Sequence, residues 1–167
     1  MQTVFRQLWP LLSRIFTEYE DSINVIEELG KVCKHAMRKL EGDFEEFLGQ
    51  LIDIISSSFT RYQHSIYMYL AEIVIWTFAQ TVPNTNNWME NLLWQMLSVA
   101  LPLLPDITAF SDKCDIADDL FGMLIRYLLY YRQAVFSETV FETIVRTAVA
   151  GVGVNNYETG KTLYTFL

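Results

Sequence analysis

The stretch HSIYMYLAEIVIWTFAQ, from His64 to Gln80, has the length of a helix and carries apolar side chains on nearly every side. A helix that is apolar all round must be covered by neighbours on several sides. We therefore expect this segment to be an inner element of a stack of helices. A compact helical bundle is the alternative, but a bundle would give every helix a polar outer face, and this stretch has none.

A unit of one amphipathic helix, a short break and a second helix recurs around this stretch, with openings near residues 3, 43, 88 and 134. The steps of 40, 45 and 46 residues fall within the period of about 40 to 47 that is typical of HEAT and armadillo arrays. The sequence thus predicts an all-α fold, an α-solenoid of about four HEAT-type helix pairs. The expected array spans 1–167, with repeats at about 3–41, 43–80, 88–131 and 134–167.

Local signals set the expected helix limits. The first helix, 3–19, carries a stripe of apolar residues at helical spacing: Val4, Leu8, Leu11, Leu12, Ile15 and Phe16. Asp43 and Glu46 have the spacing of a capping box at the start of the third helix. The remaining expected helices are 23–40, 44–59, 64–80, 88–104, 115–131 and 136–150, with a loop at 81–87, a break at 151–156 and a last helix from residue 157.

The composition is unusually apolar. Hydrophobic residues make up 51%, the mean hydropathy is +0.19, and charged residues make up 19%, against about a quarter in an average soluble domain. In a solenoid each repeat buries its faces against its neighbours, and terminal repeats need a polar outer side. Because the terminal stretches MQTVFRQLW and KTLYTFL lack such a side, we expect a piece of a longer array.

Charge and targeting signals narrow the class of protein. The net charge of −8 argues against nucleic acid as a direct partner. Cys33 and Cys114 form no Cys-x-x-Cys motif, which favours a reducing compartment. No signal peptide is recognisable, and the most hydrophobic run, 66–79, is too short to cross a bilayer and contains Glu72. We expect a soluble intracellular protein that does not bind membranes.

Residue patterns for catalysis are missing from the sequence. His35 and His64 belong to no helical zinc or di-iron motif, and there is neither a phosphate-binding glycine loop nor a nucleophile elbow. Gly151-Val-Gly153 follows no strand, so it is better explained as a helix terminator. We therefore predict no enzyme activity, no metal and no cofactor.

Three cations stand out on the second helix. Lys31, Lys34 and Arg38, which we call the basic ridge, lie within about 60° of one another at 100° per residue. The opposite arc is apolar: Val25, Ile26, Leu29, Val32, Cys33, Ala36, Met37 and Leu40. The second helix of a HEAT pair lines the concave side, where a row of cations would attract carboxylates or phosphates. The alternative is a solvated helix face, on which Glu27 pairs with Lys31.

Exposed aromatic side chains could also form a binding hot spot, since Trp and Tyr are enriched in such places. The candidates are Trp88, Trp94, Tyr127, Tyr130 and Tyr131. We favour packing between repeats as the role of these residues.

Three segments resemble a known family. LWPLLSRIF (Leu8–Phe16), YQHSIYMYL (Tyr62–Leu70) and DIADDLFGMLIRYL (Asp115–Leu128) look like successive stretches in the C-terminal half of the transportin-SR (transportin three) receptors, which belong to the importin beta superfamily. Their order and spacing cover nearly the whole chain. The related importin thirteen receptors are similar at Asp43-Phe44 and Gln50-Leu51.

This resemblance implies a karyopherin that shuttles between nucleus and cytoplasm. Such receptors carry cargo through the nuclear pore, where they meet nucleoporins. They release the cargo when Ran-GTP binds to N-terminal repeats, which this chain would lack. The implied cargo is a splicing factor rich in arginine and serine, bound by an arginine-rich helix similar in position to Asn24–Leu40. The basic ridge falls on three of the basic places of that helix, which makes Lys31, Lys34 and Arg38 the candidate cargo-binding residues.

The chain departs from the family pattern on this helix. Asn24 and Glu28 stand where two further basic residues would be expected, and two of the three cations are lysines, which cannot make the bidentate phosphate contact of arginine. A static HEAT-repeat scaffold subunit is the competing function. It predicts binding that is independent of Ran.

Overall fold

The computed structural model describes residues 2–79, 86–136 and 138–167. These residues form helices joined by short turns, and none of them is in a strand, which confirms the all-α prediction. The α-helices are α1 (Gln2–Glu18), α2 (Ile23–Leu40), α3 (Glu45–Tyr62), α4 (Ile66–Phe78), α5 (Asn86–Ala100), α6 (Ile107–Asp112), α7 (Cys114–Tyr130), α8 (Arg132–Val135), α9 (Glu138–Ala150) and α10 (Tyr157–Phe166). Two 3-10 turns are η1 (Glu41–Phe44) and η2 (Leu101–Leu103).

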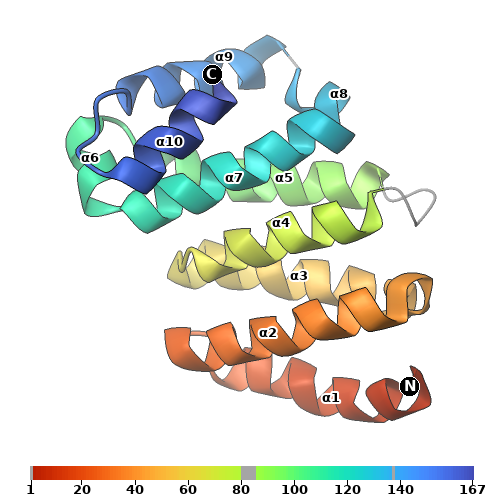
Figure 1. Cartoon of the computed structure of the whole chain (residues 1–167). Coiled ribbons are helices and arrows are strands. Elements are labelled where there is room, and N and C mark those ends of the chain that lie inside the picture. The colour runs from red at the N-terminus through yellow and green to blue at the C-terminus, as the bar shows by residue number, and fades with distance from the viewer. Residues whose placement is uncertain (1, 80–85, 137) are drawn as a thin grey trace.

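The long helices stack in two rows, as Figure 1 shows. One row, which we call the second-helix row, consists of α2, α4, α7 and α10, each packed against the next. In the other row α1 packs on α3, and α3 on α5. This arrangement is the predicted α-solenoid. It also explains the apolar surface of α4, because α2, α7, α3 and α5 all contact that helix.

Most helix limits follow the sequence signals, with two additions. The helix predicted at 23–40 has the same limits as α2. Between α5 and α7 lies the short helix α6, whose N-cap Asp106 accepts hydrogen bonds from the backbone N–H groups of Thr108 and Ala109. The short helix α8 lies between α7 and α9. These insertions make the step between the third and fourth pairs longer than the others, while the proposed repeat limits themselves stay a prediction.

The predicted loop at 81–87 falls mainly outside the described residues. Its last two residues, Asn86 and Asn87, belong to α5. Residue 80, expected at the end of the fourth helix, and residue 137, expected in the seventh, are also outside the described part.

The predicted break after α9 is confirmed. The N–H of Gly151 donates to the carbonyl of Ala148, and Gly153 has a φ of 94°, a left-handed value that favours glycine. A Cβ atom at Gly151 would lie 2.5 Å from Cε1 of Phe110. The Gly151-Val-Gly153 motif is therefore a helix terminator that also admits the Phe110 ring.

The apolar stripe predicted on α1 is partly wrong. Val4, Leu8 and Leu11 are exposed, whereas Phe5, Trp9 and Phe16 are buried. The rings of Phe5 and Trp9 join a cluster with three other aromatic side chains, Phe44, Phe47 and Phe78. Aromatic side chains bury more area than leucine and valine, so the aromatic face of α1 turns toward α3.

The predicted capping box at the start of the third helix is also wrong. Phe44 is the N-cap of α3, without a side-chain cap, and Asp43 lies in η1. The Glu46 carboxylate instead accepts hydrogen bonds from Arg6, at 2.8 and 3.0 Å. An ion pair to the preceding helix pair therefore replaces the local cap.

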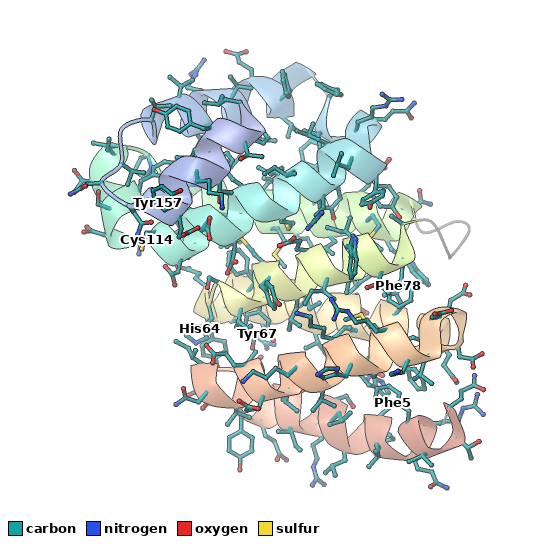
Figure 2. The ribbon with its side chains drawn as sticks, viewed as in Figure 1. Phe5, His64, Tyr67, Phe78, Cys114 and Tyr157 are labelled. Carbon is teal, nitrogen blue, oxygen red and sulfur yellow. The ribbon has the colours of Figure 1, made fainter. Side chains whose placement is uncertain are left out.

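The first two helix pairs are joined by a polar cluster at one end of α4, where Figure 2 shows His64 and Tyr67. The Tyr67 hydroxyl donates to the Glu20 carbonyl (2.9 Å), and Nε2 of His64 lies 3.0 Å from the carbonyl of Asp21. The Glu20 carboxylate contacts Arg61 at 2.6 Å and accepts a hydrogen bond from Ser58 at 3.1 Å. Glu20 thus connects the turn after α1 with α3 and α4.

Replacing Glu20 with glutamine should lower the free energy of unfolding by about 1 to 2 kcal/mol, because charge-assisted hydrogen bonds in a partly desolvated place are the stronger ones. The Glu20 side chain is only 12% exposed. Urea unfolding followed by circular dichroism measures the change. Glu18→Gln is the control, since its pair with Arg14 is long (3.6 Å) and exposed, and it should cost less than about 0.5 kcal/mol. Equal losses in both variants would contradict the role of Glu20.

No helix in the described ranges combines the length and apolar character needed to span a bilayer.

Candidate functional site

The basic ridge divides into two parts in the structure. Lys31 is exposed and its ammonium lies 2.6 Å from the Glu28 carboxylate, with both side chains more than 60% exposed. In the alternative of a solvated helix face we named Glu27 as the partner of Lys31, but the ion pair forms with Glu28, three residues before Lys31. A pair exposed to this degree is screened by solvent and adds little to stability. Lys31 thus faces solvent, apart from the other two cations.

Lys34 and Arg38 lean toward α4. The Lys34 ammonium donates to the Tyr69 hydroxyl (2.7 Å) and lies 5.3 Å from the centre of the Tyr69 ring. The Arg38 guanidinium carbon lies 5.2 Å from the ring centre of Trp76, which is 46% exposed. Cation–π contacts at such exposed places contribute about 0.5 to 1 kcal/mol. Both cations are therefore held on aromatic surfaces of the neighbouring helix.

These contacts border a hollow on the second-helix row, which we call the basic groove. It encloses about 270 Å³ and is lined by Lys34, Arg38, Tyr69, Glu72, Ile73, Trp76 and Arg126, from α2, α4 and α7. Nε of Arg126 donates to the Glu72 carboxylate at 2.9 Å. A second hollow of about 250 Å³, lined by Arg38, Glu41, Trp76 and Thr77, lies beside the same Arg38–Trp76 pair.

The basic groove carries charge opposite to that of the chain. Its three cations and one carboxylate give a net charge of +2, whereas the whole chain carries −8. A concentrated patch of one sign attracts groups of the other sign and raises their local concentration. The charge of the groove therefore suits anionic groups.

Sequence reasoning found Lys34 and Arg38 but missed the α4 and α7 side of the groove. Tyr69, Glu72, Ile73 and Trp76 have the spacing of one helix face. The signal in the sequence is that Tyr69, Glu72 and Trp76 carry polar groups within an otherwise apolar stretch. Arg126 could not be added from the sequence, because its place opposite Glu72 depends on how α7 packs on α4.

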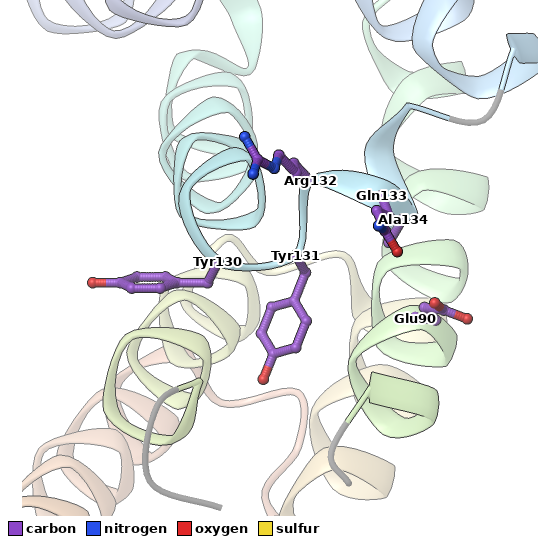
Figure 3. Close-up of a pocket in the computed structure, with 6 residues that line it drawn as sticks. All are labelled: Glu90, Tyr130, Tyr131, Arg132, Gln133 and Ala134. Carbon is purple, nitrogen blue, oxygen red and sulfur yellow. The ribbon is translucent and has the colours of Figure 1, made fainter. Parts of the chain in front are cut away.

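A smaller hollow lies at the turn between α7 and α8. It encloses about 210 Å³ and is lined by Glu90 of α5 and by residues 130–134. Figure 3 shows Tyr130 and Tyr131 pointing in different directions from this turn, with Glu90 across the hollow. One acid and one base, Glu90 and Arg132, leave its lining without net charge. It is a weaker candidate than the basic groove for binding a charged partner.

The structure separates the candidate aromatic residues. Tyr127 is fully buried and its hydroxyl donates to the Met89 carbonyl at 2.8 Å, which confirms packing as its role. Trp88 and Trp94 are 41% and 46% exposed, so the expectation that they pack between repeats is wrong. The Trp88 ring still approaches α3, since a Cβ atom at Gly49 would lie 3.9 Å from its Cζ2.

An ionisable carboxyl, Asp119, lies on α7 and meets Ser65 at the start of α4. Burial raises the pKa of Asp119 to about 7, against a hydrogen bond from Ser65 that lowers it, and the negative charges of Asp118, Glu72 and Asp115 raise it further. The folded chain therefore holds this proton up to about pH 7, while the unfolded chain releases it near pH 4. Stability should fall as the pH rises between these two values.

Asp119→Asn should remove this pH dependence and stabilise the fold above pH 7. Because Asp119 is only half-buried, we expect a gain of about 1 kcal/mol at pH 8 and almost none at pH 4. Urea midpoints measured at pH 4, 6 and 8 test this. Asp115→Asn, at an exposed position near the start of the same helix, is the control and should change stability by less than about 0.5 kcal/mol. A constant difference between wild type and Asp119→Asn across the pH range would contradict the assignment.

Comparison with known proteins identifies related sequences. A family described as the Transportin-3/Importin-13 fourth TPR domain matches residues 1–104. Transportin MOS14 of Arabidopsis thaliana is 24% identical over 159 residues, which cover 95% of this chain and 16% of that relative. The chain therefore spans about a sixth of the length of the curated relative it matches. The matched range contains α1 to α5 with η2, and hence the α2 and α4 sides of the basic groove.

Proposed function

This chain belongs to the Transportin-3/Importin-13 family, and we propose that it is a cargo-binding segment of a nuclear import receptor. Members of this family are transport receptors rather than enzymes, and they bind protein cargo. The helix-pair solenoid suits that task, because a stack of helix pairs offers a long surface for another chain.

The observation that carries the proposal is the basic groove on the second-helix row. Lys34 and Arg38 are held there on Tyr69 and Trp76, so their charges are positioned before a partner arrives. Preorganised side chains lose less conformational entropy on binding. Lys31 lies on the same helix but is paired with Glu28, and we assign it a peripheral part in cargo binding.

The expected cargo is a protein rich in arginine and serine, carried between cytoplasm and nucleus past nucleoporins and released by Ran-GTP. The resemblance of 8–16, 62–70 and 115–128 to transportin-SR supports this cargo class. Acidic or phosphorylated groups of the cargo would occupy the basic groove. Ran-GTP would act on parts of the receptor outside this chain.

The test is capture of nuclear proteins on the receptor that contains this segment, with and without Ran-GTP. We expect arginine-serine-rich proteins to be retained and to be released when Ran-GTP is added. Retention that does not respond to Ran-GTP would instead support a static scaffold subunit and would overturn the import proposal.

A further inference from the structure

We infer that Arg126 and Glu72 set the affinity of the basic groove, and that its occupant is an extended acidic peptide whose carboxylates compete with Glu72 for Arg126. This inference rests on the proposed function, since it specifies what the same groove binds. It adds two residues from α4 and α7 to a site that the sequence placed on α2 alone.

The Arg126–Glu72 pair joins α7 to α4. Nε of Arg126 donates to Oε1 of Glu72 at 2.9 Å, and the two side chains are 36% and 22% exposed. Gly122 lies on α7, one turn before Arg126. A Cβ atom added at Gly122 would lie 3.4 Å from Oε2 of Glu72, so the Glu72 carboxylate lies beside this glycine. Only the Nε side of the guanidinium is used in this contact, so its other N–H groups remain able to bind a second carboxylate.

The other two cations of the basic groove, Arg38 and Lys34, also keep N–H groups available. The Arg38 guanidinium lies over the Trp76 ring, and a stacked guanidinium keeps its N–H groups in the plane, available at the edges. One N–H of the Lys34 ammonium donates to the Tyr69 hydroxyl, and the ammonium has two further N–H groups. In the described part of the chain, Glu72 is the only carboxylate among the residues that line the basic groove.

The width of the basic groove sets the length of the partner segment. The groove is lined by α2, α4 and α7, which belong to three successive helix pairs. Packed helices lie about 8 to 10 Å apart, and an extended chain advances about 3.3 Å per residue. A segment of about six residues thus crosses the groove. Two single negative charges would balance the net charge of +2, which favours carboxylates at two places in that segment.

The experiment is a double-mutant cycle on the 167-residue chain. The probe is a fluorescein-labelled octapeptide of alternating glutamate and serine, and the readout is fluorescence anisotropy at low salt. We expect Glu72→Gln to tighten binding and Arg126→Gln to weaken it, each by about three- to ten-fold. In the Arg126→Gln background the gain from Glu72→Gln should vanish, because Glu72 acts through Arg126.

Two controls keep the outcomes distinct. Lys39→Gln removes an equal charge from an exposed position outside the groove and should change the dissociation constant less than two-fold, while circular dichroism confirms that all variants remain folded. Unchanged affinity in Glu72→Gln, or an equal gain in both backgrounds, overturns the inference. A phosphoserine version of the peptide that binds when the glutamate version does not would also overturn it.

Failure of this inference differs from failure of the proposed function. If Lys34 and Arg38 matter for cargo and the Glu72→Gln cycle shows no coupling, the groove binds cargo without Arg126. If the receptor retains no cargo in a Ran-dependent manner, the import proposal fails whatever the peptide does.

Discussion

Replacing Phe44 with alanine should lower the free energy of unfolding by about 3 to 5 kcal/mol, the range for removing a fully buried phenylalanine. Phe44 has no exposed surface and lies on η1, between the first two helix pairs. Its ring centre is 5.5 Å from that of Phe5, 5.6 Å from Phe47 and 5.7 Å from Phe78. One side chain thus contacts α1, α3 and α4, and its loss leaves a cavity among all three.

Urea unfolding followed by both near-ultraviolet and far-ultraviolet circular dichroism measures this effect. In a stack of repeats the interfaces between neighbours carry much of the stability, so the aromatic near-ultraviolet signal should weaken before helix content falls. Leu8→Ala is the control, because Leu8 lies on α1 and is 45% exposed; it should cost less than about 1 kcal/mol. A loss below about 1.5 kcal/mol in Phe44→Ala would show that the cluster does not join the helix pairs.

The general architecture was predictable because helix periodicity and all-round apolarity are properties of the chain itself. The stretch from His64 to Gln80 predicts an inner helix, and α4 is contacted by helices of both rows. Helix α2 has the predicted limits, since its apolar arc and its turn residues are local features. Such features do not depend on which neighbour covers them.

The details that failed are those decided by competition between neighbours. Glu46 could cap its own helix or pair with Arg6, and the packing of α1 on α3 places Arg6 within 2.8 Å. Two apolar faces of α1 were available, and the face with Phe5 and Trp9 is the buried one. Local sequence patterns contain both possibilities, and only the tertiary arrangement selects between them.

The candidate site was predictable to the same extent. Helical spacing placed Lys34 and Arg38 on one side of α2. It placed Lys31 on the same side and gave no reason to separate it from the other two cations. The structure distinguishes them, because α4 presents Tyr69 and Trp76 only to Lys34 and Arg38. Lys31 instead pairs with Glu28 of its own helix. Spacing on one helix cannot show which of its cations a neighbouring helix will hold.

This distinction gives the largest expected effect on binding. Lys34→Glu combined with Arg38→Glu should weaken binding of an acidic cargo segment by about 30-fold or more, equivalent to about 2 kcal/mol. The substitutions replace two attractive charges in the basic groove by two repulsive ones and leave Tyr69 and Trp76 without their cations. Anisotropy titration with the cargo, at two salt concentrations, measures the loss and its electrostatic share.

The matched control is Lys31→Glu combined with Lys39→Glu, which changes the net charge by the same amount on the same helix. Lys31 and Lys39 are exposed and do not line the groove. If long-range attraction alone governs binding, the two double variants will lose equal affinity and the loss will disappear at high salt. If the groove holds the cargo, the Lys34 and Arg38 pair will lose far more, and part of that loss will persist at high salt, because contacts within a partly desolvated groove are screened less.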